Sequence, residues 1–188
     1  MMKMTVQTTL LSAVFVFLSM GTAIAQKTAT GKVALLDDTR FERGFTVWSP
    51  EPGGHVRQGV IQPGAAAAAP VWGLAQWHSR FTLAEAQREQ LPDGSLRFDD
   101  GAKSVTFFSP TAEADIALAL NGNIEYGGTA PQTGDPWPHL LAERKLLVHP
   151  AVTELDSVPM AIRYRLVRAR TYRPDGFDAR RHTAQFVF

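Results

Sequence analysis

The chain has 188 residues and carries 19 Lys and Arg against 18 Asp and Glu, so its formal charge is close to zero. This balance argues against binding to nucleic-acid phosphates as the main role, and no nucleic-acid partner is expected. The absence of cysteine excludes disulfides, thiol catalysis and cysteine metal sites. A hydrophobic content of 45% is enough for a packed core.

The N-terminus has the three parts of a secretory signal peptide. Lys3 is its only charge, an apolar run covers residues 10–20, and the small residues Ala23 and Ala25 frame a cleavage site. The run is short for a membrane span, which takes roughly 20 apolar residues. We therefore predict a signal peptide at 1–25, a periplasmic or secreted product and no membrane anchor after cleavage. The alternative is an N-terminal anchor that is never cleaved.

The remainder is predicted to be a short lead-in and one domain. Residues 26–32 are small and polar, which is typical of a disordered lead-in, and residues 33–188 have the size of one domain. The alanine-rich stretch 63–70 has proline at both ends, which favours a surface loop.

Turn signals divide the middle of the chain into short strands. Asp93-Gly94, Asp100-Gly101 and Asn121-Gly122 are pairs typical of tight hairpins. They separate four runs that are expected to be strands, at residues 96–98, 104–108, 116–120 and 124–126.

Two further segments have clear patterns. Residues 82–85 have the form of a capping box, and 84–90 have good helix propensity, so a helix of at most two turns is expected before Pro92. Residues 160–170 alternate apolar and basic side chains, which predicts a strand with one wet face. Many short strands and one helical segment indicate an all-β protein, a sandwich or jelly roll.

The first candidate binding segment is the predicted strand at residues 71–81. In an extended chain Gln76, His78 and Arg80 point to one face, with apolar side chains on the other. Arginine binds carboxylates through two hydrogen bonds, and glutamine offers a donor and an acceptor, so this row suits sugar hydroxyls or a uronate. The alternative is a solvated outer face.

The second candidate segment contains Trp137 between two prolines, followed by His139 and Glu143. The prolines restrict the backbone around the indole. An aromatic platform next to an imidazole and a carboxylate could bind a sugar ring or support acid/base chemistry. Alternatively, Trp137 fills one end of the core and His139 caps a loop.

Several familiar signatures are absent from the sequence. Glu154 and Asp156 match the start of a β-glucanase motif, but Pro159 stands where the second glutamate belongs. His182 and Gln185, in a predicted strand at 182–188, fall on opposite faces. The sequence contains no zinc motif, nucleotide loop or serine-hydrolase elbow, and we expect neither a metal nor a cofactor.

Three short motifs together resemble a group of secreted bacterial proteins with the concanavalin A-like lectin/glucanase fold, mostly uncharacterised. The motifs are residues 76–81, 125–127 and 135–141. The resemblance covers roughly residues 71–188. It implies a jelly-roll sandwich of two antiparallel sheets and a place among polysaccharide-processing proteins. Similar proteins continue for further strands, so the resemblance also implies a sandwich that is incomplete at the C-terminus of this chain.

The resulting hypothesis is a secreted or periplasmic β-sandwich that binds a polysaccharide or oligosaccharide. Its groove would use the six side chains of the two segments, namely Gln76, His78, Arg80, Trp137, His139 and Glu143. One alternative is a polysaccharide-degrading enzyme, a lyase or a glycoside hydrolase, because this fold serves binders and enzymes alike. Another is a non-catalytic envelope or assembly protein. A tyrosine beside a histidine and an arginine would favour a lyase, and two close carboxylates a hydrolase.

Overall fold

The structure is a computed structural model that describes residues 34–64, 68–180, 182, 184 and 185. The predicted signal peptide at 1–25 and lead-in at 26–32 lie outside the described residues. The chain divides into two units, one formed by residues 36–145 and 171–188 and the other by the remaining residues. The candidate site lies in the first of these, the larger unit.

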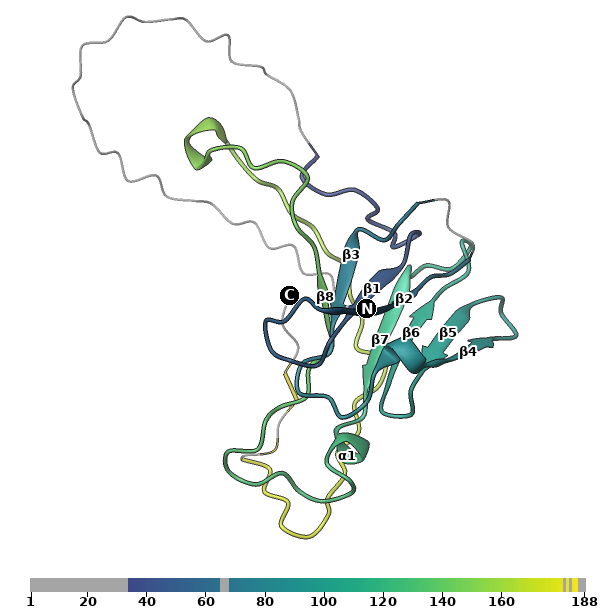
Figure 1. Ribbon diagram of the computed structural model, residues 1–188, viewed down its shortest axis with the longest axis vertical. Helices are drawn as coiled ribbons and strands as arrows, with labels where there is room; N and C mark the ends of the chain where they lie inside the picture. Colours follow the sequence, from purple (N-terminus) through teal and green to yellow (C-terminus); the bar gives the residue numbers. More distant parts are fainter. Residues whose placement is uncertain (1–33, 65–67, 181, 183, 186–188) are drawn as a thin grey trace, which may run out of the picture. The chain divides into compact units, whose positions relative to one another are not determined.

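The larger unit contains two four-stranded sheets in its described residues (Figure 1). The first sheet has the strand order β2-β1-β3-β8, and the second has the order β4-β5-β6-β7. The first is built from β1 (Phe45–Trp48), β2 (Arg57–Ile61), β3 (Trp72–Ala75) and β8 (Leu141–Glu143). The second is built from β4 (Gln87–Gln90), β5 (Leu96–Asp99), β6 (Lys103–Phe107) and β7 (Ile116–Leu120).

One core cluster joins the two sheets. Phe45 of β1 contacts Phe107 of β6 with ring centroids 5.9 Å apart, and Val47, Leu74 and Val105 are fully buried in the same cluster. Alternate residues of β1 and β5 are buried, as expected for strands with one face on a core. The predicted all-β architecture is confirmed as a β-sandwich-like arrangement of two sheets.

The expectation of two antiparallel sheets is wrong for the first sheet. Its central strands β1 and β3 run parallel, with Phe45 opposite Trp72 and Val47 opposite Leu74. All pairings in the second sheet are antiparallel. A parallel pair needs a crossover connection, and here β2 and the segment up to residue 71 lie between β1 and β3 in the chain.

The Asp-Gly turns of the second sheet are confirmed. Asp93 accepts a hydrogen bond from the backbone N–H of Ser95 between β4 and β5, and Gly94 has a φ of +83°. Asp100 accepts from the N–H groups of Ala102 and Lys103 between β5 and β6. Short aspartate side chains stabilise such turns by bonding to the backbone that follows.

The other two local predictions are corrected. Thr82 does cap a turn, since its hydroxyl accepts from Ala84, but this 3-10 turn, η1, covers only Leu83–Glu85. The following residues form β4 because pairing with β5 outweighs their helix propensity. The predicted strand at 124–126 is instead the helix α1 (Gly122–Glu125) with Tyr126 at its C-cap, because Asn121 acts as N-cap.

Three predicted strands also differ from the structure. Strand β3 ends at Ala75, and residues 76–79 turn, with the N–H of Ser79 donating to the carbonyl of Gln76. Residues 160–170 form no strand and belong to neither sheet, and a strand requires a hydrogen-bonded neighbour. In the predicted strand at 182–188, the described residues 182, 184 and 185 are irregular.

The described part of the second unit is mostly irregular. The backbone N–H of Leu147 donates to the carbonyl of Leu35, and a 3-10 turn, η2, covers Val152–Glu154. Throughout the described ranges, no helix has the length and apolarity that a membrane crossing requires.

Candidate functional site

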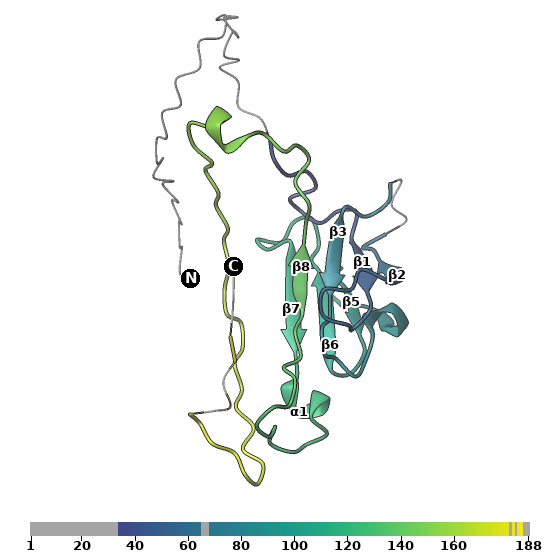
Figure 2. The ribbon, with the colours of Figure 1, turned by 60° about the vertical axis from the view of Figure 1, so that its left-hand side comes forward.

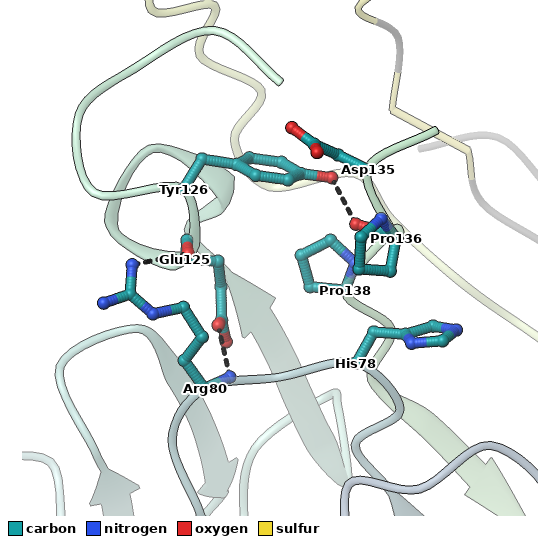
Figure 3. A pocket seen from close by; sticks show the side chains of 7 residues that line it. All are labelled: His78, Arg80, Glu125, Tyr126, Asp135, Pro136 and Pro138. Atoms are coloured by element: carbon teal, nitrogen blue, oxygen red, sulfur yellow. Dashed lines mark hydrogen bonds between the residues drawn. The ribbon is translucent and has the colours of Figure 1, made fainter. Parts of the chain in front are cut away.

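A cavity of about 230 Å³ lies where the segment after β3 meets α1 and the proline-rich segment before β8. Both ribbon views place α1 at one end of the sheets, beyond β7 (Figures 1 and 2). The cavity is lined by seven residues, namely His78, Arg80, Glu125, Tyr126, Asp135, Pro136 and Pro138 (Figure 3). Its walls thus combine two cations or potential cations, two carboxylates, a phenol and two rigid rings.

Arg80 presents an exposed guanidinium at this cavity. Its Nη1 donates to the main-chain carbonyl of Glu125 at 3.3 Å, and Figure 3 shows the guanidinium beside that residue. None of the salt bridges formed by the described residues involves Arg80. The guanidinium therefore retains donors for a further acceptor, and an arginine has five N–H groups in all.

His78 stands on the same segment, in a left-handed backbone conformation with a φ of +59°. Its backbone N–H donates to the carbonyl of Pro50 at 2.8 Å, which fixes the turn. A non-glycine residue in this region is uncommon. The conformation sends the exposed imidazole away from the Arg80 guanidinium (Figure 3), with its ring centroid 6.3 Å from that of His139. The two side chains therefore do not form one continuous row.

Tyr126 closes the opposite wall. Its hydroxyl donates to the carbonyl of Pro136 at 3.0 Å, which ties α1 to the proline segment. Burial raises the pKa of the Tyr126 phenol, and the negative charges of Asp135 and Glu125 raise it further. The folded protein consequently holds the phenolic proton more tightly than a free tyrosine does.

Behind the cavity lies a buried polar cluster, which we call the Glu125 cluster and define as Ser79, Asp100, Lys103 and Glu125. The Lys103 ammonium is 2.8 Å from Asp100 Oδ2 and 3.3 Å from Glu125 Oε1. Ser79 Oγ donates to Glu125 Oε1 at 2.5 Å and accepts from Lys103 Nζ at 2.5 Å. The side chains of Lys103 and Glu125 are 0% and 1% exposed, so this is a fully desolvated ion pair.

The close approach of Lys103 to Ser79 does not make Ser79 a nucleophile. A serine nucleophile needs a neutral base and access to substrate. Here the Lys103 nitrogen is engaged by the carboxylates of Asp100 and Glu125, and the Ser79 hydroxyl is already bonded within the cluster. Ser79 is buried and does not line the cavity. The cluster therefore supports the cavity from behind.

Gln76 is fully buried behind this surface. Its Nε2 donates to the carbonyl of Trp48 at 2.9 Å and to the hydroxyl of Thr82 at 2.8 Å, and its Oε1 accepts from the N–H of Leu83 at 3.0 Å. The amide joins β1 to the segment that leads into η1. A side chain engaged in this way has no free face for a ligand, so Gln76 has no place in the site proposed below.

The second predicted segment does come next to the first. The backbone N–H of His139 donates to the carbonyl of Trp77 at 2.9 Å, and Ala75 pairs with Leu141 as β8 joins β3. Trp137 is 42% exposed between the two cavity prolines. Glu143 lies within β8, where its carboxylate is 3.2 Å from His55 Nε2. His78, Arg80, Trp137 and His139 thus lie in adjoining segments, whereas Glu143 faces His55.

Arg80 also borders a second, larger cavity of about 1080 Å³ along β4. Two of its carboxylates already have partners, since Asp100 pairs with Lys103 and Asp99 with Arg97. Glu85, Arg88 and Glu89 add exposed charges of both signs. The mixed charge gives this cavity no clear preference for an anionic or a cationic ligand.

Sequence reasoning missed Tyr126, Asp135 and the Glu125 cluster. The sequence pattern predicts a strand at residues 124–126, which hides the role of α1 in bringing Glu125 and Tyr126 to the cavity. Lys103 had a usable signal, because it occupies an inward-facing position in a run whose alternate residues Val105 and Phe107 are core. Within the described residues, no group of three or more His, Asp or Glu side chains could hold a metal ion.

Comparison of the chain with known proteins gives no match, whether to a family model, to a curated protein or to a solved structure. The geometry of the cavity and the chemistry of its residues therefore carry the functional argument.

Proposed function

We propose that this protein is an exported carbohydrate-binding protein of the concanavalin A-like jelly-roll class, and that its ligand is a polysaccharide or oligosaccharide with acidic sugars. The observation that carries the proposal is an exposed arginine that forms no salt bridge with any residue the structure describes, at a cavity of about 230 Å³. This volume lies below the ~300–1,000 Å³ of pockets for drug-sized ligands, so the cavity suits one sugar unit.

The lining supplies what a sugar ring requires. Arg80 offers N–H donors, Asp135 offers acceptors and the Tyr126 hydroxyl oxygen, whose proton is donated to Pro136, can accept a further bond, which matches the donors and acceptors of sugar hydroxyls. The rings of Pro136 and Pro138 and the exposed indole of Trp137 give apolar surface for the C–H face of a sugar. A uronate carboxylate would form charge-assisted hydrogen bonds with the free N–H groups of the Arg80 guanidinium.

The test is a binding experiment with paired ligands. Purified protein is screened on an array of acidic polysaccharides, and a uronate oligosaccharide is then compared with its methyl ester by calorimetry. Arg80→Ala should weaken binding of the acid at least about tenfold and change binding of the ester little, since only the acid can pair with the guanidinium. Arg88→Ala, which removes an exposed arginine from β4 outside this cavity, is the matched control. Failure of the intact protein to retain any glycan would overturn the proposal.

A second candidate function, a polysaccharide lyase, is favoured by one observation: Tyr126, His78 and Arg80 line the same cavity. In such a reaction Arg80 neutralises the uronate carboxylate, and a nitrogen of His78 takes the proton from C5. The C4–C5 double bond then forms as the bond from C4 to the glycosidic oxygen breaks, and the Tyr126 phenol protonates the departing oxygen. The raised pKa of Tyr126 keeps that proton in place beforehand.

The lyase candidate is tested by following the ultraviolet absorbance of unsaturated uronates as acidic polysaccharides are incubated with the protein. His78→Gln and Tyr126→Phe should each abolish product formation while leaving binding of the polysaccharide within about threefold, because neither removes the guanidinium. Binding without any unsaturated product from the intact protein would leave a binding protein and exclude the lyase.

A further inference from the structure

Glu125 contacts the segment that carries Arg80 at three points. Its Oε1 accepts from Ser79 Oγ at 2.5 Å, and its Oε2 accepts from the backbone N–H of Arg80 at 2.9 Å. Its main-chain carbonyl accepts from Arg80 Nη1 at 3.3 Å. One residue of α1 therefore restrains both the backbone and the guanidinium of Arg80 (Figure 3).

Lys103 makes this arrangement tenable. A lone carboxylate as deeply buried as that of Glu125 would be strongly unfavourable, and the Lys103 ammonium 3.3 Å away compensates its charge. The same ammonium donates to Ser79 Oγ at 2.5 Å and to the carbonyl of Phe81 at 3.1 Å. Lys103 thereby anchors the residues immediately before and after Arg80.

The orientation of the Glu125 carboxylate has a second consequence for Arg80. The carboxylate faces Ser79, Lys103 and a backbone N–H, so the part of Glu125 that the guanidinium contacts is its uncharged main-chain carbonyl. If the carboxylate turned outward, it would form an ion pair with the guanidinium and compete with an anionic ligand. Lys103 therefore contributes indirectly to the availability of Arg80.

We propose that Glu125 and Lys103 are positioning residues, a buried ion pair that holds the Arg80 guanidinium ordered and free of a carboxylate partner so that it can receive an anionic group of the ligand. This inference deepens the proposed function and rests on it as far as the ligand is concerned. A preformed arginine binds its ligand more tightly because less side-chain entropy is lost on binding.

The decisive variant is Glu125→Gln. It keeps the shape of the side chain, but one oxygen becomes an NH2 group that must face either the Arg80 N–H or the donors of Ser79 and Lys103. Val105→Ala is the matched control, because it removes core volume from β6, the strand that carries Lys103, without touching the Glu125 cluster. Both variants are made in the full chain.

Two measurements separate positioning from general stability. The first needs no ligand: the heteronuclear NOE of the Arg80 Nε–H group reports how ordered the guanidinium is. The second is calorimetric binding of trigalacturonate and of its methyl ester. In Glu125→Gln we expect a clearly lower NOE and about tenfold weaker binding of the acid, with the ester changed by less than about twofold. In Val105→Ala we expect the NOE and the binding of both ligands to match those of the wild type.

An Arg80 NOE in Glu125→Gln equal to that of the wild type would overturn the positioning role, whatever the ligand data show. If the wild type bound neither trigalacturonate nor the other acidic glycans of the array, the proposed function would fail, while the NOE would still decide the positioning role. Should Glu125→Gln not fold, Ser79→Ala, which removes one neutral hydroxyl from the cluster, is judged by the same NOE criterion.

Discussion

Lys103 of β6 and Glu125 of α1 form an ion pair, with 3.3 Å between Nζ and Oε1, in which both side chains are almost completely shielded from solvent. These residues join the second sheet to the helix that forms one wall of the candidate site. A buried pair of this kind is not in itself strong support for stability, because desolvating two charges opposes their attraction. Removing one partner, however, leaves the other charge buried without compensation.

The first prediction concerns this ion pair. Lys103→Met should lower the free energy of unfolding by about 3–5 kcal/mol, because Glu125 and Asp100 then lose the cation between them. The double variant Lys103→Met/Glu125→Gln should recover part of this loss, since no buried carboxylate then remains at position 125. Urea denaturation of both variants measures the difference. A double variant less stable than Lys103→Met would contradict the explanation.

The second prediction concerns the buried amide of Gln76. Gln76→Leu keeps the approximate volume but leaves the carbonyl of Trp48 and the N–H of Leu83 without their partner. We expect a loss of about 2–4 kcal/mol in the free energy of unfolding, by the usual cost of two unsatisfied buried groups. Gln90→Leu, at an exposed position of β4, should change it by less than about 0.5 kcal/mol.

Ligand affinity in the fraction of Gln76→Leu that remains folded should match the wild type, because the amide is fully buried and does not line the cavity. A stable variant that had lost only binding would show instead that the amide reaches the ligand.

The sequence predicted strands β5, β6 and β7 of the second sheet because their signals are local, whereas β4 was expected to be helical. Aspartates that bond to the next backbone groups, followed by glycine, mark turns wherever they occur, as at Asp93 and Asp100. The site depended on non-local facts. Alternation placed Gln76 beside His78 and Arg80, but the strand ends at Ala75, and the turn that follows is held by a bond from His78 to Pro50. No pattern within residues 71–81 reveals that contact.

The helix α1 illustrates a different limit. Asn121-Gly122 is a good hairpin signal, and asparagine is equally a good helix N-cap, so the dipeptide alone does not distinguish the two. Here Asn121 caps a helix, and Glu125 is thereby brought to Lys103, 22 positions away in the chain. A buried lysine implies a buried carboxylate nearby, but its identity depends on the tertiary structure.

The third prediction is a pH dependence at Tyr126. The folded-state pKa is raised above the ordinary value of 10.0, first by burial and then by Asp135 and Glu125. Because the folded state holds this proton more tightly, the phenol's contribution to stability is complete below pH 10 and is lost as the pH rises through the folded-state pKa. As the pH is raised above 10, the free energy of unfolding of the wild type should therefore fall more steeply than that of Tyr126→Phe.

Titration of phenolate absorbance in the wild type and in Tyr126→Phe isolates this group among the three tyrosines. Asp135→Asn should shift the titration of Tyr126 toward lower pH, since it removes one of the negative charges responsible. A Tyr126 that titrates at or below the ordinary tyrosine pKa would refute the description of this wall of the cavity.

The fourth prediction distinguishes the two roles open to Trp137. A core tryptophan replaced by alanine costs about 3–5 kcal/mol, but this indole is 42% exposed and sits between two prolines that fix the backbone without it. Trp137→Ala should therefore lower the free energy of unfolding by less than about 1 kcal/mol. It should weaken glycan binding about tenfold by removing a stacking surface.

Trp72→Ala is the matched control for Trp137→Ala. The Trp72 indole donates to the carbonyl of Asp38 at 2.8 Å and packs on Phe41 with ring centroids 4.7 Å apart. Its removal should cost at least about 3 kcal/mol, measured in the same urea titration. A loss of stability in Trp137→Ala as large as in Trp72→Ala would make Trp137 a core residue. Full stability together with unchanged glycan affinity would remove the indole from the binding surface and confine the ligand to the cavity between Arg80 and Tyr126.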